Sequence, residues 1–192
     1  MMILNRLKPG YFSIGLAIWL LSTTAQAHEF WLEPEDFTLT TDQPLRANIK
    51  VGENLLGNTY AFLPERFERF EMVQGERRSA IRSEEGAFPA VNEKDVSNGL
   101  IILAYASTPR SLRYGYVTAG KFKQFLNNEG LSWVLEQHQQ RGLPKTGFTE
   151  AYSRFGKSLI KAGSGVGADQ TVGLELELVM TCQTRFMDLR LN

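Results

Sequence analysis

Two stretches of apolar residues constrain the fold of this chain most strongly. From Leu45 to Val51 apolar and polar residues alternate, which is the period of a strand with one buried face. From Leu100 to Ser107 nearly every residue is apolar, and Asn98-Gly99 and Pro109 bound the run. Its length and β-branched content predict a central strand that is buried on both faces. The sequence therefore predicts a chain built mainly from β-strands.

Shorter segments of the same character lie on either side. We expect strands at residues 28–32, 37–41, 67–73, 114–117 and 172–179, with turn residues between them. In the last segment Glu175 and Glu177 alternate with leucines, so both carboxylates are expected on the solvent face of a strand. About six to eight short strands of this kind predict a β-sandwich.

One helical segment interrupts the strands. Apolar residues recur at helical spacing from Lys121 to Gln140, so this segment is expected to pack one stripe against the sheets. Gly130 divides it, and Gly142 followed by Pro144 ends it. Residues 150–163 carry both helical and strand signals, and a short helix that passes into a strand would satisfy both.

The first 27 residues have the layout of a secretory signal peptide. A basic start is followed by an apolar run at residues 11–21 and by small residues at Ala25 and Ala27. The run is shorter than the ~20 residues that a membrane-spanning helix needs. We therefore expect export to the periplasm and cleavage after Ala27, which leaves His28 as the first residue.

The mature chain would hold 165 of the 192 residues, enough for one domain with a hydrophobic core. Because residues 1–27 contain two of the 21 basic and none of the 21 acidic residues, its net charge would be −2. Positive and negative charges are interspersed, so no nucleic-acid partner is predicted. The single cysteine, Cys182, has no partner within the chain, and disulfides do not hold this fold together.

A histidine at the mature N-terminus suggests a metal site. The α-amine and the imidazole of His28 can close one chelate ring, a pair of nitrogen donors that suits copper(II) or nickel(II). Glu29 or the more remote His138 could complete the shell. The plain alternatives are that His28 merely opens the first strand and that His138 is a half-buried histidine at a helix end.

Enzymatic chemistry has little support in the sequence. With only two histidines, multi-histidine zinc sites and hydrolytic triads are nearly excluded, and no catalytic residue is predicted. A copper monooxygenase would need a second histidine beside the first, and only His138 is available. This class therefore ranks last.

Four segments together resemble one group of secreted bacterial proteins. They are "AHEFWLEP" at 27–34, "KFKQFLNNEGLSWVLEQHQQRG" at 121–142, "EAYSRFGKSLIKAG" at 150–163 and "VGLELELV" at 172–179. In this order they resemble the NikM-like family, which is often labelled as a periplasmic component of cobalt/nickel transport. The resemblance implies an immunoglobulin-like β-sandwich with one helical insertion, a role in handling nickel, cobalt or a similar metal such as copper, and a metal transport system in the inner membrane as partner.

The end of the chain departs from that family. Its members usually continue past the last strand into a second β-rich segment, whereas here residues 180–192 have an unrelated sequence. A truncated or frame-shifted gene would explain this departure and the lone cysteine. We therefore expect a signal peptide at 1–27, a β-sandwich domain at 28–179 and an atypical tail at 180–192.

Two functions are consistent with these features. The first is a periplasmic protein that binds or delivers a transition metal through His28. The second is a secreted β-sandwich that binds no metal and acts as an interaction module. Aromatic surface candidates that support the second function are Trp31, Tyr60, Trp133 and Tyr152.

Overall fold

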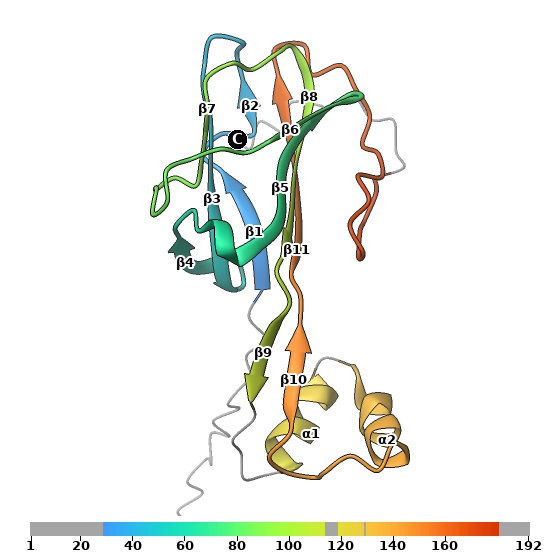
Figure 1. Cartoon of the computed structure of the whole chain (residues 1–192). Coiled ribbons are helices and arrows are strands. Elements are labelled where there is room, and N and C mark those ends of the chain that lie inside the picture. Colours follow the sequence, from blue (N-terminus) through green and yellow to red (C-terminus); the bar gives the residue numbers. More distant parts are fainter. Residues whose placement is uncertain (1–28, 114–118, 129, 181–192) are drawn as a thin grey trace, which may run out of the picture.

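Two facing β-sheets form a sandwich, and a two-stranded arm that bears two helices extends from it (Figure 1). The computed structural model describes residues 29–113, 119–128 and 130–180. One sheet has the order β1 (Glu29–Pro34), β3 (Leu45–Glu53) and β4 (Leu56–Tyr60), and β7 (Val91–Glu93) also pairs with β3. The other has the order β2 (Thr38–Leu39), β11 (Phe155–Ala162), β8 (Gly99–Ser107), β5 (Phe67–Gln74) and β6 (Arg77–Ala80). The prediction of a mainly β fold, a sandwich with a helical insertion, is confirmed.

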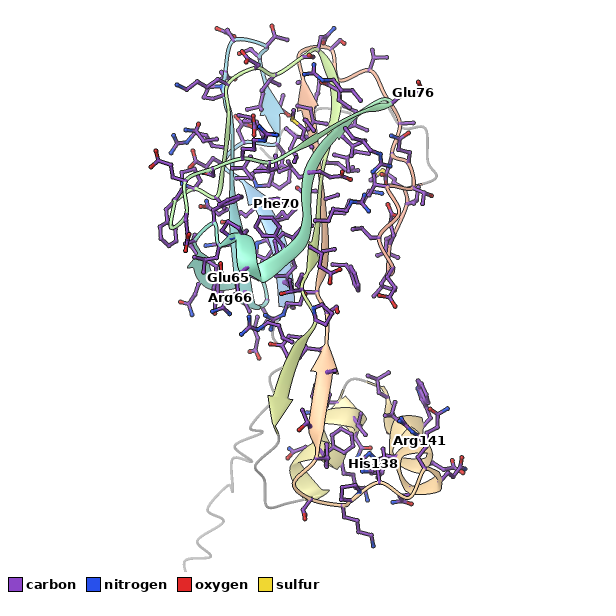
Figure 2. All side chains as sticks on the ribbon, in the orientation of Figure 1. Glu65, Arg66, Phe70, Glu76, His138 and Arg141 are labelled. Carbon is purple, nitrogen blue, oxygen red and sulfur yellow. The ribbon has the colours of Figure 1, made fainter. Side chains whose placement is uncertain are left out.

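The strand with alternating residues faces the other sheet with its apolar side. In β3, Leu45, Ala47, Ile49 and Val51 are all buried, while the residues between them are half-buried. Leu45, Ala47 and Ile49 share one core with residues of the second sheet, among them Phe70, Ile101 and Leu103 (Figure 2, where Phe70 is labelled). Period-2 alternation therefore located this half of the core correctly.

The unbroken apolar run forms β8, which lies between β5 and β11, as predicted. Its odd-numbered residues Ile101, Leu103 and Tyr105 enter the core between the sheets. Ile102 and Ala104 point to the opposite face, where they pack with Val172 and Leu174. β8 is apolar throughout because the C-terminal segment covers the face of its sheet that points away from the sandwich core.

The prediction of a strand at residues 172–179 is wrong. This segment runs along the outside of the second sheet without forming a strand (Figure 1). Arg69 and Arg78 donate hydrogen bonds to the Val172 carbonyl, and Arg69 also donates to the Gly173 carbonyl at 2.9 Å. Because side chains bind these backbone groups, they are not used in a strand ladder.

The arm continues two neighbouring strands of the second sheet, β8 and β11. β9 (Arg110–Arg113) follows β8 and pairs with β10 (Thr149–Tyr152), which leads into β11. The expectation of a helix near residue 150 is therefore wrong, and the predicted strand at 114–117 lies outside the described residues. β9 carries the chain away from the sandwich toward the helices, and β10 brings it back from them (Figure 1).

The helical segment is confirmed, but its predicted packing is wrong. It consists of α1 (Ala119–Asn128) and α2 (Ser132–Gln140), separated near Gly130, whose φ of 68° favours glycine. The helices pack against each other at the end of the arm and not on the sheets (Figure 1). In the part of the chain that the structure describes, no helix is long and apolar enough to cross a membrane.

Candidate functional site

Glu29, the first residue of β1, is already fixed by contacts with β3 and with the turn that follows β3. Glu29 lies opposite Gly52 of β3, and its Oε2 accepts a hydrogen bond from the Leu55 backbone N–H at 3.2 Å. Asn54 and Leu55 form the turn between β3 and β4 with φ angles of 50° and 60°. Glu29 thus ties the start of its strand to this turn. His28, the predicted main ligand, lies outside the described residues.

His138 lies in the last turn of α2, half-buried, as its plain interpretation predicts. Its Nε2 is 2.8 Å from the carbonyl oxygen of Pro144. Because a carbonyl only accepts, Nε2 carries a hydrogen and donates it. The ring packs against Phe122 and Phe148, with centroid separations of 5.6 and 4.9 Å. A metal ion at this imidazole would have to use Nδ1 or displace the bond to Pro144.

The structure does not bring together the two predicted ligands that it describes, Glu29 and His138. Figure 2 shows His138 at the helical end of the arm, whereas Glu29 begins β1 in the sandwich. Within residues 29–113, 119–128 and 130–180, no group of three or more histidine, cysteine or acidic residues could hold a metal ion. Of the two predicted ligands, Glu29 is the one that follows His28 directly in the sequence.

A cleft opens at the end of the sandwich from which the arm leaves. It encloses about 390 Å³ and is lined by residues of both sheets and of the arm. Three arginines contribute to its wall: Arg66 in the short helix η1 (Pro64–Arg66), Arg110 at the start of β9, and Arg154 just before β11. Figure 2 shows Arg66 at this end of the sandwich. Among the described residues, no aspartate or glutamate lines the cleft.

Aromatic side chains form much of the remaining wall. The Arg154 guanidinium lies 5.1 Å from the ring centroid of Tyr152, within the range of a cation–π contact. The Tyr105 hydroxyl donates a hydrogen bond to the Arg66 carbonyl at 3.2 Å. Burial raises the pKa of Tyr105 to about 12 and outweighs the opposing effect of nearby arginines, Arg154 foremost. The phenol is therefore neutral at physiological pH, and its single hydrogen is used in the bond to Arg66, so its oxygen can still accept a hydrogen bond.

The cleft has an excess of positive charge. Arg66 is paired with Glu65, whose Oε1 lies 3.4 Å from its Nε, but both side chains are about half exposed and such pairs are weak. For Arg110 and Arg154 no ion pair occurs among the residues that the structure describes. Two of the arginines that line the cleft thus have no carboxylate partner from this part of the chain.

A second charged cluster is structural. Lys157 of β11 contacts Asp169 at 2.6 Å and Glu177 at 2.9 Å, and all three side chains are at most 11% exposed. Glu177 also accepts hydrogen bonds from the backbone N–H groups of Val172, Gly173 and Leu174 at 2.8 to 3.2 Å. The prediction that Glu177 faces solvent on a strand is therefore wrong. Its carboxylate fixes the C-terminal segment in its irregular course.

The cleft arginines were not identified from the sequence. Arg66 precedes β5, whereas Arg110 and Arg154 lie on the two sides of the arm, 44 positions apart. They meet only because β8 pairs with β11 and places Ser107 next to Arg154, with a 2.9 Å backbone hydrogen bond between them. No local spacing signals that meeting.

These features define a β-sandwich with a helix-bearing arm and a basic, aromatic cleft between the two. A family model described as "Domain of unknown function (DUF4198)" matches residues 25–185, and the chain belongs to this family. The comparisons with curated proteins and with solved structures found no match.

Proposed function

We propose that this chain is a periplasmic protein that binds a transition metal ion, nickel, cobalt or copper, through His28 and delivers it to a metal transport system in the inner membrane. The proposed role is binding and not catalysis. The observation that supports it best is the start of β1, since Glu29 is paired with Gly52 and hydrogen-bonded to Leu55. Cleavage after Ala27 would leave His28 as a single residue in front of an anchored strand.

An anchored strand favours chelation by the residue in front of it. The α-amine and the imidazole of His28 would be two donors on one residue, so binding them to one metal ion costs little further chain entropy. Copper(II) and nickel(II) prefer nitrogen donors in a plane, and cobalt accepts the same donors less tightly. Glu29 could add an oxygen ligand if its carboxylate exchanges the bond to Leu55 for the metal.

His138 has a smaller part in this proposal. The arm separates α2 from β1 (Figure 1), and the imidazole already donates to Pro144. A site shared by His28 and His138 within one chain is therefore not favoured by the geometry. We expect His138→Ala to leave metal affinity unchanged.

Titration calorimetry with copper(II) and nickel(II) tests the proposal on protein whose N-terminus has been sequenced as His28. We expect His28→Ala, and separately a form that retains Ala27, to weaken binding at least about tenfold, because each change leaves one donor where the chelate needs two. Affinity of the cut protein should also fall in acid, since protons compete for both nitrogens.

Equal affinity of the cut and extended forms would refute His28 as the ligand. The second candidate, an interaction module without metal, would then be preferred. Trp133 and Tyr60 support that candidate, because they are 56% and 46% exposed and offer large aromatic surfaces for contact.

A further inference from the structure

We propose that the cleft between the sandwich and the arm binds a small organic anion that carries two or more carboxylates on a flat, apolar body. This site is separate from the proposed metal chelate at His28. It is built from described residues alone, and it requires no metal.

The charge of the cleft selects an anion. Arg66, Arg110 and Arg154 all line it, and only Arg66 has an acidic partner among the described residues. Arginine is permanently charged, and its planar fork matches the two oxygens of a carboxylate. The same three groups repel a bare metal cation, so the cleft itself is unsuited to the ion proposed for His28.

The aromatic and apolar walls of the cleft favour a ligand with a flat, apolar body. Tyr60 and Tyr152 present aromatic rings, and Phe30 and Phe67 add apolar surface. Tyr105 also lines this space, and its hydroxyl donates its hydrogen to the Arg66 carbonyl, which ties the wall of the cleft to that arginine. A volume of about 390 Å³ lies at the small end of the range for organic ligands and is far larger than an inorganic anion requires.

Backbone and side-chain contacts hold Arg154 in a fixed position at the cleft. Arg154 is held by its backbone, since its N–H donates to Ser107 Oγ at 2.8 Å and its carbonyl accepts from the Ser107 N–H at 2.9 Å. The contact of its side chain with the Tyr152 ring directs the guanidinium further. Rigid elements therefore position the arginine, which lowers the entropy lost when a ligand binds.

The test is titration calorimetry on the mature protein in metal-free buffer, with trimesate as the probe. Trimesate is a benzene ring with three carboxylates, and we expect one site with a dissociation constant on the order of tens of micromolar. Citrate, which has the carboxylates without the ring, should bind more weakly, and inorganic phosphate more weakly still. Phosphate binding as tight as that of trimesate would overturn the proposed ligand class.

Variants assign the binding to the cleft. Arg154→Gln and Arg110→Gln should each weaken trimesate at least about tenfold, the usual effect of losing one charge-assisted contact. Tyr60→Ala should weaken trimesate but not citrate, because only the first ligand uses the aromatic wall. The matched control is Arg82→Gln, which removes the same charge from an exposed residue outside the cleft and should change affinity less than about twofold.

Two further results would overturn the proposal. One is the absence of trimesate and citrate binding by the unaltered protein. The other is an equal loss in Arg82→Gln and the cleft variants, which would mean that overall charge and not the cleft attracts the anion. Both results are independent of the metal titration, since no metal is present.

Discussion

Replacing Leu103 by alanine is expected to lower the free energy of unfolding by about 3 to 5 kcal/mol. Leu103 lies in the middle of β8, is fully buried, and points into the core between the two sheets. The β5 and β11 strands hold the backbone of β8 on both sides, so the chain cannot collapse around the cavity that the lost side chain leaves. Denaturation by urea, followed by circular dichroism, measures the change.

The matched control is the same substitution at Leu178, which is 89% exposed. Because little apolar surface leaves a buried environment there, we expect a change within about 0.5 kcal/mol. Similar losses in both variants would contradict the assignment of β8 as the centre of the fold. An unfolded Leu103→Ala protein would agree with it, because a cost of this size can exceed the stability of a domain.

Much of the sandwich could be predicted from the sequence because its strands follow simple periods. The alternation at residues 45–51 and the apolar run at 100–107 correspond to β3 and β8, and the strand expected at 28–32 corresponds to β1. Each of these signals depends only on which faces of a strand are buried. That property can be recognised from the pattern of apolar residues within a short window of sequence.

The errors arise where distant residues decide the structure. The pattern at 172–179 is that of a strand, yet the Glu177 carboxylate and the guanidinium of Arg69 bind its backbone groups and keep it irregular. The helical stripe was correct for α1 and α2, but amphipathic spacing indicates that a face is buried and not which partner buries it.

The cleft was missed for the same reason. Arg66, Arg110 and Arg154 come together through the pairing of β8 with β5 and β11, and the sequence alone does not give that pairing. The proposed metal site differs in kind, since it depends on one residue and a cleavage position. Such a site can be proposed from local sequence, and the structure contributes the anchoring of Glu29.

The second large effect is expected at the buried carboxylate that fixes the C-terminal segment. Glu177→Gln should lower the free energy of unfolding by about 2 to 3 kcal/mol at neutral pH. The carboxylate of Glu177 accepts hydrogen bonds from three backbone N–H groups and pairs with Lys157, and a neutral amide cannot replace the charge. In the variant Lys157 still pairs with Asp169. The expected loss of stability is therefore smaller than the loss caused by leaving a buried charge with no partner.

The pH dependence of this loss follows from the pKa of Glu177. Burial alone would raise that pKa, but the hydrogen bonds from Val172, Gly173 and Leu174 and the contact with Lys157 outweigh it and lower the pKa from 4.5 to about 2. A folded-state pKa below the unfolded one stabilises the protein above about pH 4.5, and this contribution is lost as the pH falls toward 2. The stability difference between the original protein and Glu177→Gln should therefore be full at pH 7 and shrink steadily below pH 4.5.

Glu175→Gln is the control for this experiment, because Glu175 is exposed, lies two residues earlier and changes charge in the same way. We expect it to shift stability by less than about 0.5 kcal/mol at every pH. Urea midpoints for the three proteins between pH 2.5 and 7 provide the comparison. If Glu175→Gln and Glu177→Gln lost the same stability, or if the Glu177→Gln loss did not change with pH, the buried carboxylate would not be what holds residues 172–180 against the sheet.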